Sequence, residues 1–572
     1  MAYNSTNPLI VQGDKSVLLE VNNALYEEVR DEISGFAELE KSPEYIHTYR
    51  ISPLSLWNAA SSGLSAEYII GILEKYGKFD LPQNVRADIE DNVKRFGKIR
   101  LERHDGELML ISEDRYLIAE IAANKKVAPY IKDNTNPFRL TIDRGSRGHI
   151  KHLLIKLGFP VEDLAGYAQG AHFDLALRHT DSKGNKLHLR DYQIEAADVF
   201  YAGGSDRGGC GVIVLPCGAG KTFVGMAVMD RLKSETLILT TNITALRQWK
   251  SELIDKTTVP EDCIGEYSGE IKEIKPITIS TYQILTHRND KAGDFPHLDI
   301  FNRKDWGIII YDEVHLLPAP VFRKTAEIQA KRRLGLTATL VREDGMEEDV
   351  FSLIGPKKYD MPWKTLERKG WIASACCTEV RVAMPESLRM QYSISESRQK
   401  FRIASENSEK IPIIRKLLER HISDNVLIIG QYIEQLNIIA EAVKAPIITG
   451  KTSNDERIKL YEEFKRGVIK VLIVSKVANF AIDLPDANVA IQISGTFGSR
   501  QEEAQRLGRI LRPKSGENRA FFYSIVTAES KEQEFAANRQ LFLTEQGYRY
   551  YIINSDCIEQ DFKGELQDEF RT

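Results

Sequence analysis

The chain has 572 residues, of which 42% are hydrophobic and 28% charged, and its formal net charge is −5. This length exceeds what one hydrophobic core serves, so we expect about three to five domains, and the composition excludes a disordered chain. Six cysteines without a CxxC pair exclude a disulfide scaffold and a cysteine zinc site. Because no apolar run reaches membrane-spanning length and the start lacks a secretory signal, we expect a soluble cytoplasmic protein with no membrane partner.

The first part of the chain predicts helices followed by a small mixed module. Apolar residues recur at helical spacing between residues 52 and 96, with Pro53 and Pro82 near the helix starts, where a missing N–H does no harm. The next stretches, "ELMLI", "RYLIAEI" and "FRLTI", predict strands, and "GHIKHLLIKLGF" predicts a helix. We therefore expect an N-terminal domain over residues 1–99 and an α+β module over residues 100–185.

From residue 186 onward, apolar runs alternate with helical stretches. "GVIVLP", "TLILTT", "ITIST", "WGIIIYDE" and "RRLGLTAT" come first, and "VLIIG", "APIITG", "KVLIVS", "VAIQIS" and "AFFYSIV" follow. Continuous β-rich runs between helices are typical of a parallel sheet that is covered on both faces. The predicted fold class is therefore α/β, with two doubly wound parallel-sheet domains. We place them at residues 186–355 and 356–545, with a helical insertion at about 385–421 and a C-terminal tail over 546–572.

The segment "LPCGAGKT" lies between a predicted strand and a predicted helix, which is the context of a phosphate-binding loop. Gly218 and Gly220 can take positive φ and bring backbone N–H groups to phosphate oxygens, and the helix N-terminus adds donors. We expect Lys221 to pair with the β- and γ-phosphates and the Thr222 hydroxyl to ligate Mg²⁺. The predicted nucleotide-binding residues are Leu215, Pro216, Cys217, Gly218, Ala219, Gly220, Lys221 and Thr222, with leucine at 215 where the strict Walker pattern has glycine.

Two carboxylates, Asp312 and Glu313, end the apolar run in "IIIYDEVH". At the carboxyl end of a buried strand they would face a nucleotide across the crevice of a parallel sheet. We expect Asp312 to hold Mg²⁺ through water and Glu313 to polarise the attacking water. A strand-end acidic pair alone is often only a helix cap, but beside a phosphate loop it predicts a nucleoside triphosphatase.

Two shorter segments concern the adenine base of the nucleotide and a connection to nucleic acid. In "LRDYQ", Gln193 offers a donor and an acceptor to an adenine edge, which favours ATP over GTP, and Arg190 belongs to the same candidate site. Thr337, Ala338 and Thr339 end a predicted strand, where small hydroxyl residues could connect the phosphate site with a nucleic-acid surface. Without the other motifs, a threonine-rich strand end with no such role would be equally consistent with this pattern.

The segment "GSRQEEAQRLGRILRPK" places polar and cationic residues on one face of a predicted helix. At about 100° per residue, Gln505, Arg509 and Arg512 fall within about 60° of one another. Such a face is by default only solvated, but guanidinium groups on a second α/β unit also suit arginine fingers that reach a γ-phosphate. These three residues join the catalytic candidates, and hydrolysis would then depend on domain closure.

These motifs, in this order, resemble those of superfamily 2 helicases. "LPCGAGKT", "DEVH", "LGLTATLVRED" and "GSRQEEAQRLGRILRPK" are close to the XPB family of DNA-repair helicases, and "PLIVQGDKSVLLEV" and "FAELEKSPEYIHTYRISPLSLWNAA" extend the similarity over nearly the whole chain. The resemblance, to the short prokaryotic form, implies two RecA-like domains and ATP-driven 3′→5′ movement. It also implies opening of duplex, fork or bubble DNA in nucleotide excision repair, near the nucleoid, with a nuclease or other repair protein as partner.

The resemblance also assigns roles to charged residues. The residues that match the family's RED motif, implicated in strand separation, are Arg342, Glu343 and Asp344. The helical insertion stands where the family has a thumb-like element, and its basic residues are Arg398, Lys400 and Arg402. Both groups could contact DNA, the basic one along a phosphate backbone, or they could simply be solvated charges.

Two further positions follow from the resemblance. Residues 100–185 stand where the family carries a damage-recognition module. In "SKVANFAIDLPDA", Ala478 and Asn479 replace a glycine–aspartate pair of eukaryotic members, while Asp483 is retained as a candidate for the nucleotide site. This departure leaves open which residue couples the second domain to ATP.

Two other functions are compatible with the same motifs. One is a duplex DNA translocase or remodeller that does not separate strands, and the other is a DNA-binding assembly factor whose conformation ATP switches. The complete set of hydrolysis residues argues against a switch that cannot hydrolyse ATP.

Cys217 carries a separate expectation because it lies inside the loop, next to Lys221 and a helix N-terminus. Both features favour the thiolate, so we expect electrophiles to inactivate the protein through Cys217 and ATP to protect it. A buried, inert thiol is the alternative.

Overall fold

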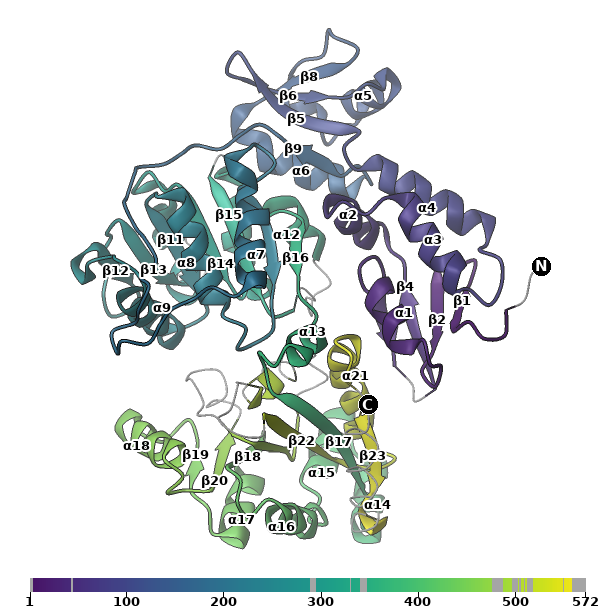
Figure 1. The fold of residues 1–572 in the computed structure, drawn as a ribbon, viewed down its shortest axis with the longest axis vertical. Helices are drawn as coiled ribbons and strands as arrows, with labels where there is room; N and C mark the ends of the chain where they lie inside the picture. Colours follow the sequence, from purple (N-terminus) through teal and green to yellow (C-terminus); the bar gives the residue numbers. More distant parts are fainter. Residues whose placement is uncertain are drawn as a thin grey trace. The chain divides into compact units, whose positions relative to one another are not determined.

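The computed structural model of the chain describes residues 4–42, 45–288, 295–329, 331–339, 347–475, 487–495, 503, 506–508, 510–511, 518–548 and 550–557. The chain forms two compact units, residues 1–216 with 220–361, and residues 362–572 with 217–219 (Figure 1). Among the described residues, no helix is long and apolar enough to cross a membrane.

The N-terminal part of the first unit is a small antiparallel sheet, in the order β1-β2-β4-β3, with helices beside it. Its elements are β1 (Leu9–Val11), β2 (Ser16–Glu20), α1 (Tyr26–Ile33), β3 (Glu38–Lys41), β4 (Ile46–Arg50), α2 (Pro53–Ser61), α3 (Ala66–Tyr76) and α4 (Gln83–Arg95). Pro53 is the first residue of α2, and Pro82 is the N-cap of α4, so both prolines begin helices as predicted.

The mixed module that follows contains a five-stranded sheet in the order β7-β8-β6-β5-β9. Its elements are β5 (Ile99–His104), β6 (Glu107–Ile111), α5 (Arg115–Ala123), β7 (Ile131–Asp133), β8 (Arg139–Ile142), α6 (Arg147–Lys156) and β9 (Val161–Asp163). The strand predicted from "RYLIAEI" is wrong, because these residues form helix α5. The Asp114 side chain accepts hydrogen bonds from the N–H groups of Tyr116 and Leu117 and caps this helix.

The first parallel sheet follows the order β12-β13-β11-β14-β15-β10-β16, and every pairing in it is parallel. Its strands are β10 (Cys210–Val214), β11 (Thr236–Thr240), β12 (Ile264–Tyr267), β13 (Ile277–Thr281), β14 (Ile308–Asp312), β15 (Arg332–Thr337) and β16 (Lys357–Asp360). Its helices are α7 (Asp191–Tyr201), α8 (Lys221–Leu232), α9 (Ile243–Lys256), α10 (Tyr282–Leu285), α11 (Ala319–Glu327) and α12 (Glu347–Leu353). Since β16 pairs with β10, the sheet continues past residue 355, where the sequence suggested that this domain ends.

The second parallel sheet follows the order β19-β20-β18-β21-β22-β17-β23. Its strands are β17 (Ser374–Val382), β18 (Val426–Gly430), β19 (Ile447–Ile448), β20 (Val471–Ser475), β21 (Val489–Gln492), β22 (Arg519–Thr527) and β23 (Tyr550–Asn554). Its helices are α13 (Trp363–Arg368), α14 (Glu386–Ile394), α15 (Ser397–Ser405), α16 (Lys410–Arg420), α17 (Ile433–Val443), α18 (Asn454–Lys465) and α21 (Lys531–Glu545). Strand β23 pairs with β17, so residues expected to form a tail complete this sheet instead.

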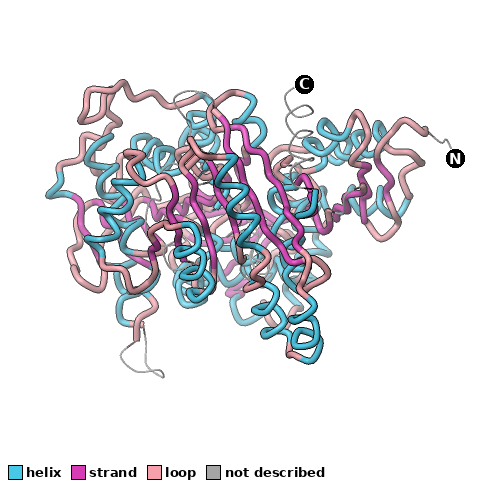
Figure 2. Tube along the Cα trace, turned by 90° about the horizontal axis from the view of Figure 1, so that it is seen from below, coloured by secondary structure: helices cyan, strands magenta, loops and turns pink. Residues whose placement is uncertain are grey.

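The two parallel sheets confirm the predicted α/β class, and strands alternate with helices along the trace in Figure 2. The central strands are buried nearly throughout; β11 and β13, for example, contain only buried residues, whereas the edge strands β16 and β23 are mostly half-buried or exposed. This explains why the apolar runs in the sequence were continuous rather than alternating. In a parallel sheet all carboxyl ends lie at one edge, which brings residues from distant parts of the chain together.

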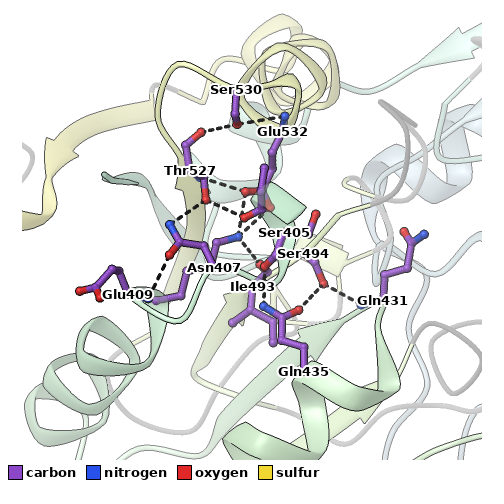
Figure 3. Close-up of polar contacts among 12 residues, drawn as sticks. Ser405, Asn407, Glu409, Gln431, Gln435, Ile493, Ser494, Thr527, Ser530 and Glu532 are labelled. Atoms are coloured by element: carbon purple, nitrogen blue, oxygen red, sulfur yellow. Dashed lines mark hydrogen bonds and ion pairs between the residues drawn. The ribbon is translucent and has the colours of Figure 1, made fainter. Parts of the chain in front are cut away.

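Helix α16 of the predicted insertion begins at a buried ion pair (Figure 3). The Lys410 ammonium, fully buried, contacts both carboxylate oxygens of Glu532 at 2.7 and 2.8 Å and donates to the carbonyl of Ile493 at 2.7 Å. Glu532 also accepts the N–H of Thr527 at the end of β22. Although burial lowers the pKa of Lys410, the nearby carboxylate opposes this shift. The insertion is therefore fixed to the strand ends of the second sheet.

Candidate active site

The phosphate loop connects β10 to α8 in the conformation that its glycines allow. Gly218 and Gly220 have φ angles of 81° and 82°, which side chains other than glycine rarely adopt. Leu215, which replaces the first Walker glycine, is fully buried, and its N–H donates to the carbonyl of Thr337 on the neighbouring strand. Position 215 thus extends the strand pairing, and this explains why a leucine is accommodated there.

Gln193, the predicted adenine contact, lies against the last glycine of the loop. A Cβ atom at Gly220 would lie 2.5 Å from the Gln193 amide nitrogen, so only glycine allows this approach. The other end of the amide, Oε1, accepts the backbone N–H of Arg190 at 2.9 Å. The structure therefore brings the "LRDYQ" segment and the phosphate loop together.

Asp312 is the last residue of β14 and Glu313 follows it at the carboxyl edge of the sheet, as predicted. Glu313 takes a left-handed conformation, with φ of 49°, and its Oε1 lies 3.4 Å from the Nζ atom of Lys221. Both side chains are largely buried, which strengthens their attraction. A cation from the loop and a carboxylate from the DEVH segment are thereby held in one site.

The carboxylate of Asp312 is fixed at both oxygens. Oδ2 accepts the indole N–H of Trp249 at 2.9 Å, and Oδ1 accepts the backbone N–H of Glu313 at 3.0 Å. Burial, together with the negative charge of Glu313, raises the pKa of Asp312 to about 6, although the Trp249 bond and Lys221 oppose the shift. The site therefore holds two negative groups beside one ammonium, and a divalent cation would relieve their repulsion.

The chemistry of these donors fits Mg²⁺. The Thr222 hydroxyl, in the first turn of α8, and the Asp312 carboxylate are oxygen ligands, which Mg²⁺ prefers. Within the described ranges, no cluster of three or more His, Cys, Asp or Glu side chains forms a closed metal cage. Mg²⁺ is typically held by few protein ligands together with water and substrate phosphates.

His315 connects the DEVH segment with the threonines that end β15. Its Nδ1 atom lies 2.7 Å from Thr337 Oγ1 and 3.5 Å from Glu313 Oε2. The Thr337 hydroxyl donates its proton to the Thr339 carbonyl, at 2.5 Å. The hydroxyl oxygen is therefore the acceptor in its hydrogen bond with His315, and the imidazole proton lies on Nδ1. A continuous polar chain thus leads from Glu313 through His315 to Thr337 and Thr339, with buried Ala338 between the threonines.

Sequence reasoning did not single out Trp249 or His315. Both are buried, and from the sequence alone a buried tryptophan on the apolar face of a helix resembles an ordinary core residue. His315 stands within the quoted DEVH motif, so its position beside the two carboxylates was the available signal.

The remaining predicted residues have different outcomes. Arg342, Glu343, Asp344, Asp483, Gln505, Arg509 and Arg512 lie outside the described residues. On α15, Arg398 is exposed and Lys400 lies 5.7 Å from the ring centre of Tyr392. Arg402 pairs with Glu406 at 3.0 Å and with Glu434 at 2.5 Å, so its charge is already neutralised by protein carboxylates.

The two parallel α/β sheets, the phosphate loop and the DEVH strand end define a helicase motor. Family models agree: "ERCC3/RAD25/XPB C-terminal helicase" matches residues 366–569, "Type III restriction enzyme, res subunit" matches 186–342, and "Helicase conserved C-terminal domain" matches 9–135. A Mycobacterium tuberculosis protein named "DNA 3'-5' helicase XPB" is 52% identical over 552 residues, 96% of this chain and 98% of the relative. The chain belongs to the XPB family of helicases and is an enzyme of that class.

More distant relatives extend the comparison. An Enterocytozoon bieneusi protein named "General transcription and DNA repair factor IIH helicase/translocase subunit XPB" is 34% identical over 97% of this chain and 94% of its own length. Among solved structures, S. cerevisiae Dbp5 bound to RNA and ADP BeF3 aligns with a TM-score of 0.45 at 14% identity. That alignment covers 65% of this chain and 92% of Dbp5.

Proposed function

We propose that this protein hydrolyses ATP with Mg²⁺ to move 3′→5′ along DNA and open the duplex, and that it does so in nucleotide excision repair. The observation that supports this most directly is the convergence of Lys221, Asp312 and Glu313 at one sheet edge. The names of two relatives, 52% and 50% identical to this chain, support the DNA substrate and the polarity, since both are called DNA 3'-5' helicases.

Each candidate residue at or beside this sheet edge has a proposed role. Lys221 exchanges its partner Glu313 for the β- and γ-phosphates when nucleotide binds, and Thr222 and Asp312 hold Mg²⁺, which neutralises the phosphate charge. Glu313, released from Lys221, orients and deprotonates the attacking water. Gln193 contacts the adenine edge, with Arg190 fixed beside it.

We propose that ATP hydrolysis is coupled to DNA through the His315–Thr337 contact. This contact is part of the series of polar contacts between Glu313 and Thr339, and Thr339 lies just before the RED segment. The resemblance to the family supports a role in strand separation for Arg342, Glu343 and Asp344. It also supports a role in hydrolysis for Gln505, Arg509 and Arg512, and a place in the nucleotide site for Asp483. On α15, Arg398 is the best placed to track a DNA backbone, because Lys400 and Arg402 have protein partners.

We further propose that the module over residues 100–185 contacts unpaired DNA in a groove of about 750 Å³ at the end of its sheet. The groove lies where β6 ends and where β5, β8 and α5 begin. It is lined by the cations Lys94, Lys98, Arg100 and Arg115, the aromatic residues Phe96, Tyr116 and Phe138, and the remaining residues Gly97, Ser112, Glu113 and Asp114. Tyr116 and Phe138 are 71% and 47% exposed. Cations with exposed aromatic rings suit phosphates and stacked bases, as a damage-recognition role requires.

The function is tested by measuring ATP hydrolysis with duplex DNA, single-stranded DNA and RNA as stimulators. We expect DNA to stimulate hydrolysis, and a larger response to RNA would contradict the proposed substrate. Strand displacement from a fork, compared with triplex displacement from intact duplex, separates a helicase from a duplex translocase. Stimulation without either movement would favour an ATP-switched assembly factor.

A further inference from the structure

Trp249 is a deeply buried residue of the first parallel-sheet unit that touches the proposed metal ligand. It lies on α9, two turns after the Asn242 cap, and is 1% exposed. Its indole N–H donates to Oδ2 of Asp312 at 2.9 Å.

The indole ring packs closely against Gly225. A Cβ atom at Gly225, in the helix that follows the phosphate loop, would lie 2.7 Å from Cη2 of Trp249 and 3.3 Å from a methyl carbon of Leu336. Gly225 therefore leaves the space that the ring occupies against α8. Because the ring cannot shift toward α8 without displacing that helix, packing limits the direction of its N–H.

We infer that Trp249 is a positioning residue that orients the Asp312 carboxylate for the metal–nucleotide complex. The Trp249 indole and the Glu313 backbone N–H each occupy one acceptor position, on opposite oxygens, and together they fix the plane of the carboxylate. The remaining acceptor positions are left for Mg²⁺ or its water. This inference rests on the proposed role of Asp312 and adds the group that determines its orientation.

An uncharged donor suits this task better than a cation. A lysine or arginine in place of Trp249 would pair with Asp312 and compete with Mg²⁺ for its charge, whereas an indole N–H contributes no net charge. Hydrogen-bond donors that contact a metal-ligating side chain orient that side chain and tune the affinity of the site for the metal. Their removal weakens metal binding by about 10- to 100-fold.

Trp306 provides a matched control in the same unit. It is also fully buried, and its indole N–H donates at 2.9 Å to a neutral group, the carbonyl of Ile300. Trp249→Phe and Trp306→Phe therefore remove the same donor and similar ring volume. They differ in whether the lost bond ended on a carboxylate of the site.

The experiment measures binding of mant-labelled AMPPNP to the full chain by fluorescence, in Mg²⁺ and in EDTA. We expect Trp249→Phe to weaken binding about tenfold or more in Mg²⁺ and less than about twofold in EDTA, and Trp306→Phe to change neither. Gly225→Ala, which displaces the ring, should reproduce the loss in Mg²⁺. Near-UV circular dichroism and the thermal midpoint identify a variant that has not folded, in which case Gly225→Ala decides.

An equal change with and without Mg²⁺, or no change in either, would overturn the positioning role of Trp249. If instead the unmodified protein binds mant-AMPPNP equally well in Mg²⁺ and EDTA, the proposed metal site itself fails. The two failures are therefore distinguishable in one data set.

Discussion

The Lys221 ammonium lies 3.4 Å from the carboxylate of Glu313, so the phosphate-binding cation and the proposed base neutralise each other. Nucleotide phosphates must replace this contact before Glu313 can act on water. Glu313→Gln removes the base and weakens the competing contact. We expect kcat to fall about 10²- to 10⁴-fold while nucleotide affinity is kept or rises. Steady-state hydrolysis and mant-nucleotide titration measure the two effects, and an unchanged kcat would show that another group activates water.

The second prediction concerns the contact between His315 and Thr337. Thr337→Val keeps the shape of the side chain but breaks the polar chain that leads from Glu313 to Thr339. We expect the DNA-stimulated part of ATP hydrolysis to be lost while hydrolysis without DNA stays within about threefold, since no proposed phosphate contact is removed. The control is Thr325→Val, another buried threonine of this unit. Full DNA stimulation in Thr337→Val would exclude this route of coupling.

Cys217 allows a chemical test of the loop. It is half-buried and not in a disulfide, and we infer from its place in the loop, before Lys221 and a helix N-terminus, that it is reactive. We expect N-ethylmaleimide to abolish ATP hydrolysis, Mg·ATP to protect, and Cys217→Ser to give resistance. Cys263→Ser is the control, because burial and Asp262 raise the pKa of the Cys263 thiol. Modification that leaves hydrolysis intact, or continued sensitivity of Cys217→Ser, contradicts the expectation.

The groove of the mixed module predicts a separate contribution to DNA binding. The double variant Tyr116→Ala/Phe138→Ala removes two exposed rings, and stacking on one ring contributes about 1–3 kcal/mol per base. We therefore expect affinity for single-stranded DNA, measured by fluorescence anisotropy, to fall about tenfold or more. Phe79→Ala is the control, since Phe79 is as exposed as Phe138 but lies outside the groove. Equal affinities for the double variant and the control would remove the groove from the DNA path.

Much of the fold was predictable because buried parallel strands have continuous apolar runs in their sequence. The central strands of both sheets, the loop glycines and the Asp312–Glu313 strand end all followed from such local patterns. The strand predicted at "RYLIAEI" is wrong because short apolar runs fit both periodicities, and the Asp114 cap favours the helix. Edge strand β16, KKYD, has charged residues at three of its four positions and therefore has no apolar run. Strand β23, YYIIN, does contain an apolar run, and the prediction of a tail there was wrong.

The candidate site was predictable only where a motif is continuous in the sequence. Lys221, Thr222, Asp312 and Glu313 belong to such motifs. Trp249 touches Asp312 across 63 positions of the chain, and only the packing of α9 on the sheet reveals that contact. In the same way, the partners that neutralise Arg402 include Glu434 on a different helix, which helical periodicity within α15 does not indicate.

The most direct test of the account follows ATP hydrolysis and strand separation together on a forked DNA with a 3′ tail. If the triphosphate at the Lys221–Glu313 edge drives the motor, the unmodified protein displaces the strand, and Lys221→Ala and Glu313→Gln abolish displacement together with hydrolysis. Displacement that persists in either variant after its ATP turnover has been lost would contradict it.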